Sequence, residues 1–302
     1  MCSLLSDKEY LFLINPKSGK MSVSKKERLI KELAVDENFK VIVTLSEEHA
    51  KQLATEAMLA GQIVVACGGD GFHNVVAQQA IETGGLMSVV PLGRGNDFAK
   101  SLGIYSLIEA KRAITDGIIC NARYLRVEFE NYSRISLTCA GVGLLSEAAD
   151  RAAKLPFLKG KMLYCFAALL SFINLKRHRY KLTLDEHSIC KDLLIFAGAA
   201  SEYTGGGIFI APDARKDPLR MNVLFAESVN RRVAFRLLIK ALSGKHLSHE
   251  KVTSTFRSRC HIENKTDSYW SSLVYGDGEY LGILPSTLSV GDRPLNLMIP
   301  KD

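Results

Sequence analysis

The chain of 302 residues lacks the cysteine pattern of a disulfide framework. Its seven cysteines are an odd number, no two of them form a CxxC pair, and most of them lie in apolar runs such as Val64-Val65-Ala66-Cys67. Buried free thiols in a reducing compartment explain this distribution better than disulfides. The histidines from His178 onward show no metal-ligand spacing with cysteines or carboxylates, so the sequence predicts no zinc centre.

Long hydrophobic runs are absent as well. The most apolar segment extends from Met162 to Leu175, includes Ser171 and Asn174, and falls short of the ~20 residues that a helix needs to span a bilayer. The first residues contain no basic stretch followed by an apolar one, so we expect no secretory signal. Together these absences predict a cytoplasmic location.

The net charge of the chain does not identify a class of binding partner by itself. A formal net charge of +7 favours an anionic partner, which could be a nucleic acid, an acidic lipid surface or a polyphosphate. A basic surface with no special partner would carry the same charge. The basic residues are dispersed and no basic patch is interleaved with aromatic residues, so we expect no nucleic-acid binding.

The first part of the chain alternates buried apolar runs with helical patterns. The expected strands are Tyr10–Ile14, Lys40–Thr44, Ile63–Cys67 and Leu86–Pro91, and the expected helices are Val23–Leu33, Glu47–Leu59 and Asn74–Ile81. This alternation predicts a parallel α/β sheet with helices on both faces. We place this first domain at residues 1–122.

After about residue 120 the apolar residues recur with period two, which is typical of antiparallel strands with one solvated face. The expected strands are Arg123–Phe129, Arg134–Thr138, Tyr180–Leu184, Asn222–Phe225 and Leu295–Ile299, and the expected helices are Leu158–Leu175 and Arg231–Ser243. These elements predict a β-rich second domain at residues 123–290. The last strand, within residues 291–302, is expected to return to the first domain.

The turn Gly68-Gly69-Asp70-Gly71 follows a buried strand and precedes a helix. Glycines let the backbone approach a phosphate, and the exposed N–H groups with the helix N-terminus supply positive partial charge. Asp70 is then explained as a ligand of metal-bound water or as a base. The alternative is a tight turn whose aspartate caps the helix.

Two further loops of similar character end other strands. Asn15-Pro16-Lys17-Ser18-Gly19-Lys20 follows the first strand, and Pro91–Ala99, which contains Gly93-Arg94-Gly95-Asn96-Asp97, follows the fourth. The carboxyl ends of parallel strands meet along one edge, where ligands of open α/β sheets bind. The sequence therefore predicts that these loops converge on one phosphate-binding site.

These loops resemble those of the diacylglycerol kinase catalytic-domain family, which includes bacterial diacylglycerol kinases and YegS-like lipid kinases and is related to sphingosine and ceramide kinases. The resemblance extends over essentially the whole chain through Asn15–Gly19, Thr44, His49-Ala50, Gly68–Asn74, Pro91–Ala99, Gly205–Gly207, Ala211–Ala214 and Asp277–Glu279. It implies an N-terminal parallel α/β domain, like that of NAD kinases and phosphofructokinases, followed by a β-sandwich domain that handles the lipid.

The resemblance also implies an activity: transfer of the γ-phosphate of ATP, with Mg²⁺, to the hydroxyl of a diacylglycerol-like lipid. The implied nucleotide-binding residues are Asn15, Pro16, Ser18, Gly19, Lys20, Thr44, Gly68, Gly69, Asp70, Gly71, Asn74, Gly93, Arg94, Gly95, Asn96 and Asp97. Asp70 and Asp97 are expected to hold Mg²⁺ through water, and Asp70 is also counted among the catalytic residues. Asp277 or Glu279 is expected to accept the hydroxyl proton; the alternative is that Asp277-Gly278 is a hairpin turn.

The chain departs from the family pattern at several positions. Phe72 stands in place of a small hydroxyl residue and Val75 in place of a carboxylate, whereas Arg94 replaces a threonine and could bind phosphate bidentately. Pro218, Leu219 and Asn222 interrupt a segment that holds a structural Mg²⁺ in bacterial members. A hard cation needs oxygen ligands, so we do not expect that second metal site here.

Three functional hypotheses follow: an active lipid kinase, a nucleotide- or lipid-binding member that has lost catalysis, and, with a poorer fit, an NAD kinase. A lipid substrate requires peripheral contact with a membrane. The segment Lys159–Arg179 could provide a basic-flanked amphipathic helix, and its basic cluster favours contact with anionic lipid. The alternative, favoured for the helix itself, is a domain-packing helix with a cationic last turn. Exposed sheet edges in the second domain make a homodimer plausible.

Overall fold

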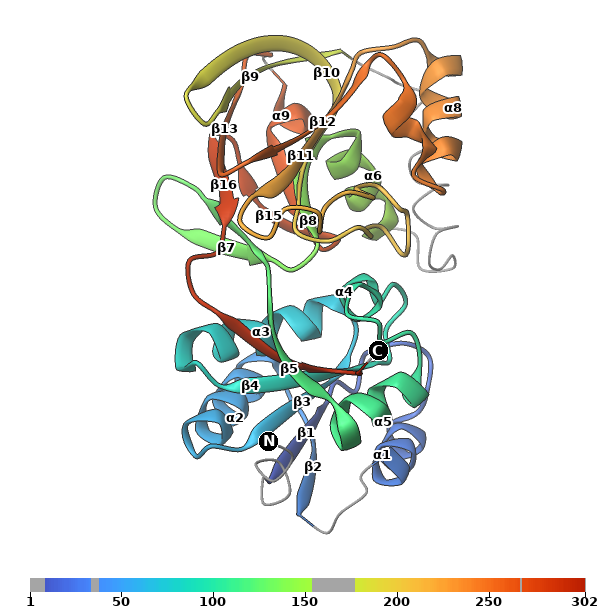
Figure 1. Ribbon diagram of the computed structural model, residues 1–302, viewed down its shortest axis with the longest axis vertical. Helices are drawn as coiled ribbons and strands as arrows, with labels where there is room; N and C mark the ends of the chain where they lie inside the picture. The colour runs from blue at the N-terminus through green and yellow to red at the C-terminus, as the bar shows by residue number, and fades with distance from the viewer. Residues whose placement is uncertain (1–8, 34–37, 154–176, 267, 302) are drawn as a thin grey trace. The chain divides into compact units, whose positions relative to one another are not determined.

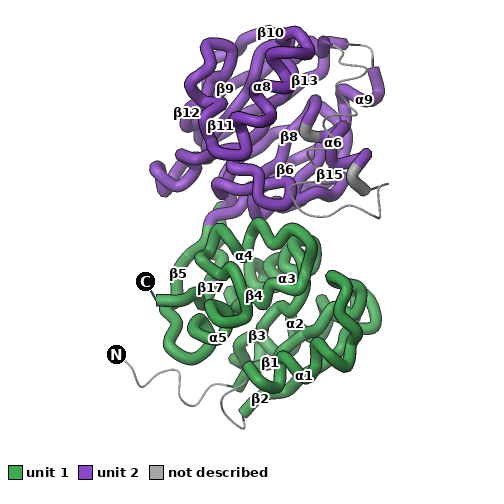
Figure 2. The backbone as a smooth tube through the Cα atoms, turned by 90° about the vertical axis from the view of Figure 1, so that its right-hand side faces the viewer, with its two compact units in different colours: residues 1–122, 292–302 green, residues 123–291 purple. Residues whose placement is uncertain are grey.

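The computed structural model describes residues 9–33, 38–153, 177–266 and 268–301. The chain forms two compact units, one of residues 1–122 with 292–302 and the other of residues 123–291 (Figure 2). Each unit has a sheet of its own. Within the described ranges, no helix combines the length and apolar character needed to cross a membrane.

The sheet of unit 1 has six strands in the order β2-β1-β3-β4-β17-β5 (Figure 1). The strands are β1 (Tyr10–Ile14), β2 (Phe39–Val43), β3 (Ile63–Gly68), β4 (Leu86–Pro91), β5 (Ile118–Ala122) and β17 (Leu295–Ile299). All neighbouring pairs are parallel except β17 and β5, which are antiparallel. Every residue of β3 is buried, as expected of a central strand covered on both faces.

Five helices are described in unit 1: α1 (Val23–Leu33), α2 (Glu47–Leu59), α3 (Asp70–Thr83), α4 (Asp97–Ser101) and α5 (Leu107–Asp116). The helices α2 and α3 pack together on one face of the sheet, and α1 and α5 pack together on the other (Figure 1). The predicted parallel α/β fold is thereby confirmed.

The sheet of unit 2 is antiparallel and has eleven strands, with the path β15-β14-β8-β10-β9-β13-β16-β6-β7 and with β11 joining β10 to β12. The strands are β6 (Leu125–Glu128), β7 (Ser133–Ser136), β8 (Cys139–Gly143), β9 (His178–Leu184), β10 (His187–Ala199), β11 (Met221–Glu227), β12 (Val252–Arg257), β13 (Arg259–Asn264), β14 (Leu273–Gly276), β15 (Glu279–Ile283) and β16 (Ser286–Val290). The described helices are α6 (Leu144–Ala153), α8 (Arg231–Ala241), α9 (Tyr269–Ser272) and the short 3₁₀ helix η1 (Lys245–Ser248).

The main core of unit 2 combines buried side chains from most strands of this sheet. Its largest fully buried side chains include Tyr180 and Phe196, and the Tyr180 hydroxyl donates to the Ser271 carbonyl oxygen at 2.8 Å. Alternating burial along β9 matches the period-two pattern of its sequence. The predicted β-rich second part is confirmed as an antiparallel, sandwich-like fold.

One predicted helix begins earlier than expected, and another cannot be compared with the structure. The helix predicted at Asn74–Ile81 begins at Asp70, with Gly69 as its N-cap, so Asp70 and Gly71 belong to the first helical turn and not to a free loop. An aspartate in the first turn is favoured by the helix dipole, which explains the earlier start. The helix predicted at Leu158–Leu175 lies outside the described residues, as does the basic flank up to Lys176. His178 and Arg179, the end of the predicted cationic last turn, lie instead in strand β9.

Candidate functional site

The loop after β1 is folded onto itself by backbone groups. The Ser18 hydroxyl donates to the Asn15 carbonyl oxygen at 2.9 Å, and the Asn15 side-chain oxygen accepts the Lys17 N–H at 2.9 Å. The backbone N–H of Asn15 donates to the Cys67 carbonyl oxygen of β3 at 3.1 Å. The loop is thus fixed to the end of the neighbouring strand, while the Lys20 side chain is exposed.

Lys26 of α1 is a second anchor for this loop. Its side chain is fully buried, and its ammonium donates to the carbonyl oxygens of Asn15 and Pro16 at 2.9 Å each. Burial lowers the pKa of Lys26 from its ordinary value. The sequence analysis missed this lysine, because it is one of several in a lysine-rich helix and nothing local distinguishes it.

Thr44 secures the end of β1 from the other side. It is buried just after β2, where its N–H and its hydroxyl both donate to the Ile14 carbonyl oxygen, at 2.9 and 3.2 Å. The hydroxyl is therefore engaged with the backbone in this structure. This geometry makes Thr44 a support of the loop that follows Ile14.

Glycines bring the loops after β1, β3 and β4 into contact. A Cβ on Gly93 would lie 2.4 Å from the Gly69 Cα, and one on Gly19 would lie 2.3 Å from the Leu92 carbonyl oxygen. Gly19 also has a φ of +61°, which favours glycine. The Leu92 N–H donates to the Gly68 carbonyl oxygen at 2.7 Å. The convergence expected from the sequence is present in unit 1.

Two carboxylates stand where α3 and α4 begin. Asp70, the first residue of α3, accepts the Phe98 N–H at 3.0 Å and so bonds to the first turn of α4. Asp97, the first residue of α4, is buried and forms an ion pair with Lys100 at 3.5 Å. Asp70 therefore caps α4, and the two carboxylates lie on neighbouring helix starts.

The same region contains an amide that shapes the loop after β4. Asn96 has a left-handed φ of +55°, and its side-chain oxygen accepts the Gly93 N–H at 2.9 Å. The Lys100 ammonium donates to the Gly95 carbonyl oxygen at 2.6 Å. Arg94 lies at the tip of this loop with an exposed side chain, so its guanidinium is accessible to a ligand.

The residues that depart from the family pattern are packed in different ways. Phe72 is buried against Gly68, where a Cβ would meet its side chain at 2.7 Å, and Val75 is half-buried. The Asn74 side-chain oxygen accepts the Gln78 amide at 2.8 Å along α3. His73 is fully buried, and burial lowers its pKa to about 4, so the ring is neutral and serves as packing.

In unit 2, the turn between β14 and β15 presents Asp277 to the β7–β8 connection. Its carboxylate accepts four hydrogen bonds: from the Ser136 hydroxyl at 2.9 Å, the Leu137 N–H at 2.7 Å, and the Thr138 N–H and hydroxyl at 2.9 and 2.7 Å. Asp277 has a φ of +54°, in keeping with the tight turn that the Asp-Gly pair predicted. Glu279, at the start of β15, is exposed.

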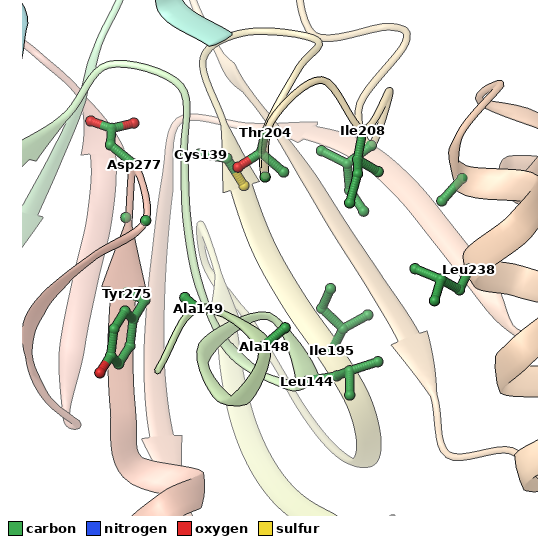
Figure 3. A pocket seen from close by; sticks show the side chains of 15 residues that line it. Cys139, Leu144, Ala148, Ala149, Ile195, Thr204, Ile208, Leu238, Tyr275 and Asp277 are labelled. Atoms are coloured by element: carbon green, nitrogen blue, oxygen red, sulfur yellow. The ribbon is translucent and has the colours of Figure 1, made fainter. Parts of the chain in front are cut away.

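An apolar cavity of about 80 Å³ lies beside this turn (Figure 3). Its wall is formed by α6, β10, α8, the Thr204–Ile210 segment and the β14–β15 turn, and includes Leu144, Ala148, Ile195, Ile208, Leu238, Tyr275 and Asp277. Burial raises the pKa of the lining Cys139 thiol, and the charge of Asp277 raises it further. The sequence analysis missed this cavity because its walls come from distant segments, and only the Gly205–Gly207 run marked one of them.

The described residues contain no group of three or more His, Cys, Asp or Glu side chains arranged to hold a metal ion. The oxygen pair of Asp70 and Asp97 still fits Mg²⁺ held through water, because Mg²⁺ keeps several waters and takes one or two carboxylates together with substrate phosphates. The nucleotide-site residues expected in unit 1 are thus brought together around the three loops. Asp277 and Glu279 lie together in unit 2.

Comparison with known families divides the chain into two matched regions. Residues 9–127 match the diacylglycerol kinase catalytic domain, and residues 138–299 match the YegS C-terminal NAD kinase beta sandwich-like domain. The second match alone extends over more than half of the chain.

Curated relatives and solved structures agree with these matches. A diacylglycerol kinase of Mycobacterium tuberculosis (strain CDC 1551 / Oshkosh) is 26% identical over 265 residues, covering 86% of this chain and 84% of the relative. A diacylglycerol kinase of Bacillus subtilis (strain 168) is 25% identical over 259 residues, covering 84% and 83%.

Among solved structures, a diacylglycerol kinase from Bacillus anthracis str. Sterne has a TM-score of 0.72 at 14% identity and 97% coverage of both chains. An NAD kinase from Archaeoglobus fulgidus in complex with ATP has a TM-score of 0.51 at 12% identity, with 97% and 94% coverage. These likenesses concern the fold. Together with the two matched regions, they show that the chain belongs to the diacylglycerol kinase family, with the diacylglycerol kinase catalytic domain followed by the YegS-type C-terminal domain.

Proposed function

We propose that the protein is an ATP-dependent lipid kinase that transfers the γ-phosphate of ATP to the hydroxyl of a diacylglycerol-like lipid. The observation that carries the proposal is the contact between the glycine loops of unit 1, where Gly69 and Gly93 meet without room for a side chain. Backbone packed this closely beside a helix N-terminus offers N–H groups to a phosphate. The names of the relatives support a lipid acceptor.

The nucleotide is assigned to the loops after β1, β3 and β4. The N-terminus of α3 provides positive partial charge for phosphate, and the exposed Arg94 guanidinium provides two parallel donors. Asp70 and Asp97 would hold Mg²⁺ through water, and the metal would neutralise charge on the phosphates. Phosphoryl transfer depends mainly on such positioning and electrostatic stabilisation.

We assign to Glu279 the role of the base that accepts the proton of the lipid hydroxyl. Three of the four donors around Asp277 bond to its Oδ1 and the fourth, the Leu137 N–H, bonds to Oδ2, so this carboxylate is engaged by the β7–β8 connection through both of its oxygens. Glu279 lies two residues further along, at an exposed position. Asp277 then acts as a positioning residue that holds the turn carrying Glu279.

The apolar cavity in unit 2 is the proposed place for part of the lipid. Its volume of about 80 Å³ is far below the roughly 300–1,000 Å³ of pockets that enclose a drug-sized ligand. The cavity therefore suits one end of the lipid, and the remainder of the acyl chains would stay in the bilayer. Peripheral membrane contact is part of the proposal for this reason.

Exposed aromatic side chains next to this cavity support membrane contact. Tyr275 lines the cavity and its ring lies 5.8 Å from that of Tyr280, while Tyr269 and Trp270 pair at 6.0 Å in α9. Burial raises the pKa of Tyr280, with smaller contributions from the nearby phenols of Tyr132 and Tyr269. Tyrosine and tryptophan prefer the boundary between water and lipid.

A second candidate is a family member that binds nucleotide or lipid without catalysis. Phe72 and Val75 favour it, because neither side chain offers a polar atom beside the glycine loops. The two candidates share the fold and the loop geometry. They differ in whether phosphate reaches a lipid.

A phosphate-transfer assay separates them. The purified full chain would be incubated with γ-labelled ATP, Mg²⁺ and vesicles containing diacylglycerol, monoacylglycerol, ceramide or sphingosine. We expect label in one lipid class, its loss in Asp70→Asn, and retention in the matched control Asp116→Asn at the exposed end of α5. Nucleotide binding without any labelled lipid would favour the non-catalytic candidate, and labelling of NAD in place of a lipid would indicate an NAD kinase.

A further inference from the structure

The segment Ala211–Val223 of unit 2 is where family resemblance implies a structural Mg²⁺, and an arginine reaches into it instead. The Arg123 guanidinium donates to the backbone carbonyl oxygens of Ala214 at 2.6 Å and Arg220 at 3.0 Å, and also to that of Asp217. These partners lie between 91 and 97 positions away in the sequence. Three backbone oxygens therefore converge on one organic cation.

The side chains of the segment do not fit a divalent metal. The Asp217 carboxylate accepts the N–H groups of Leu219 and Arg220 at 2.9 and 3.1 Å and the Arg220 side chain at 2.6 Å. These hydrogen bonds, that of the Leu219 N–H first, lower the pKa of Asp217. Asp213 forms an ion pair with Lys216 at 2.7 Å. The carboxylates that could bind a metal are thus engaged by groups of the segment itself.

Two further positions support the same conclusion. Pro218 has no side-chain oxygen, and the Asn222 amide is turned to the Ser254 hydroxyl of β12 at 3.0 Å. Mg²⁺ demands near-octahedral oxygen coordination and Ca²⁺ takes six to eight oxygens. Three carbonyl oxygens already bonded to a guanidinium do not provide such a set.

The segment is connected to the wall of the apolar cavity. The Ala211 N–H donates to the Glu202 carbonyl oxygen at 3.2 Å, and Arg215 forms an ion pair with the Glu202 carboxylate at 3.0 Å. Between these contacts lie Thr204, Gly205, Ile208 and Ile210, all of which line the cavity. A cation that fixes Ala214 therefore also limits the movement of this wall.

We propose that Arg123 takes the place of a divalent cation in this segment, so that the cavity wall formed by residues 204–210 is held without metal. Arginine suits the task because its planar fork reaches several carbonyl oxygens from one anchored side chain and its charge is permanent. A lysine at this position has a single ammonium and no fork. The structural part of the inference is independent of catalysis, whereas its bearing on the lipid rests on the proposed kinase activity.

Limited trypsin digestion of the nucleotide-free full chain gives a local test. Arg215, Lys216 and Arg220 are potential cleavage sites within the segment. We expect the wild type to be cleaved there equally slowly with EDTA and with Mg²⁺. We expect Arg123→Ala to be cleaved there at least about tenfold faster, and Arg123→Lys to lie between the two. Arg259→Ala, which removes an exposed arginine on β13, is the matched control and should behave as the wild type.

Thermal unfolding and metal content complete the experiment. The wild-type midpoint should be the same in EDTA and in Mg²⁺, and Arg123→Ala should unfold roughly 5 °C lower. Faster cleavage of the wild type at Arg215 or Lys216 in EDTA would overturn the proposal. So would a stoichiometric divalent ion that remains after dialysis in the Asp70→Asn variant. If Arg123→Ala does not fold, the same measurements on Arg123→Lys and on the wild type in EDTA still test the proposal.

A kinetic arm addresses the lipid. In Arg123→Ala we expect the KM for the lipid to rise while the KM for ATP is unchanged, because only the cavity wall is loosened. A KM for the lipid that is the same in Arg123→Ala and in the wild type would overturn the link to the cavity. Absence of kinase activity in the wild type would count against the proposed function alone, since the digestion result does not depend on turnover.

Discussion

Thr138 binds Asp277 twice, through its backbone N–H at 2.9 Å and its hydroxyl at 2.7 Å, both to the same carboxylate oxygen. The two residues lie 139 positions apart, and their contact joins the β7–β8 connection to the β14–β15 turn. The turn that carries Glu279 is consequently fixed by a charged acceptor. In the sequence, Asp277 and Glu279 are equivalent candidates for the base. The contact with Thr138 gives Asp277 a structural role that Glu279 does not share.

The first prediction concerns this pair of carboxylates. Glu279→Gln should lower kcat by roughly 10²–10⁴-fold, the usual contribution of a general base, and should leave the unfolding midpoint unchanged. Asp277→Asn should lower the free energy of unfolding by about 2 kcal/mol, because an amide NH₂ would face N–H donors. Lipid-phosphorylation rates and thermal melts would be measured on the same preparations. A stable Asp277→Asn protein whose defect is confined to kcat would reverse the assignment.

The second prediction concerns the metal and the carboxylates at the helix starts. Asp70→Asn and Asp97→Asn should each raise the Mg²⁺ concentration needed for half-maximal activity by roughly 10–100-fold, as expected for groups that act through metal-bound water. Titration of activity with Mg²⁺ at saturating ATP is the measurement. Asp116→Asn serves as the control, and an unchanged Mg²⁺ requirement in Asp70→Asn would argue against the water-mediated role.

The third prediction concerns the glycine contact. Gly93→Ala places a methyl group 2.4 Å from the Gly69 Cα, so one loop must move. Misplacement of this kind should weaken ATP use by roughly 10²-fold. Gly61→Ala is the control: its φ is +80° and no atom lies within 4 Å of the added carbon, so it should affect stability but not ATP binding. Calorimetric titration with ATP would show the difference, and equal affinities for the two variants would exclude the loops as the phosphate site.

The sequence was sufficient to predict the fold because the signals for it are local. Helices α1 and α2 and strands β1, β4 and β17 begin and end where their apolar runs or apolar periodicity predicted. The convergence of the three loops after β1, β3 and β4 was predicted for a related reason, since parallel strands necessarily bring their carboxyl ends to one edge. The start of α3 was misplaced because glycines at a helix N-terminus resemble glycines in a turn.

The support of the site could not be predicted in the same way. Its supporting contacts join residues that are far apart in the chain, as Lys26, Thr138 and Arg123 do when they donate to backbone oxygens or a carboxylate. The hydrophobic pattern of the sequence does not indicate such contacts. The cavity wall likewise combines α6, β10 and α8, whose residues look like ordinary core. Most of the predicted basic-flanked helix lies outside the described residues, and its predicted end at His178 and Arg179 belongs to strand β9. A homodimer through the sheet edges of unit 2 stays a prediction.

The fourth prediction follows from the buried imidazole of His73. Burial lowers its pKa to about 4 from the ordinary 6.5. Between these two values the unfolded chain takes up a proton that the folded chain does not, so stability should fall as the pH drops from about 6.5 and level off near about 4. The full effect is about 3 kcal/mol, at 1.36 kcal/mol for each pKa unit.

Denaturant melts of wild type and His73→Leu across this pH range would test the origin of the loss. The leucine variant has no group to titrate at this position and should retain more of its stability at low pH. His187→Asn, at an exposed position in β10, is the control and should follow the wild type. If His73→Leu loses as much stability as the wild type, other groups dominate the acid response.

The last prediction concerns membrane contact, and the chain contains its own probe. Trp270 is the only tryptophan in the sequence, and its side chain is 47% exposed in α9, beside Tyr269. If these aromatic residues enter the lipid interface, vesicles should shift the tryptophan emission to shorter wavelength. Tyr269→Ser and Tyr280→Ser should weaken vesicle binding in a flotation assay, whereas Tyr105→Ser, which removes an equally exposed tyrosine from unit 1, should not. Binding without an emission shift would place the contact elsewhere on the molecule. A shift that appears only at high protein concentration without vesicles would assign these aromatic residues to a contact between two copies of the chain.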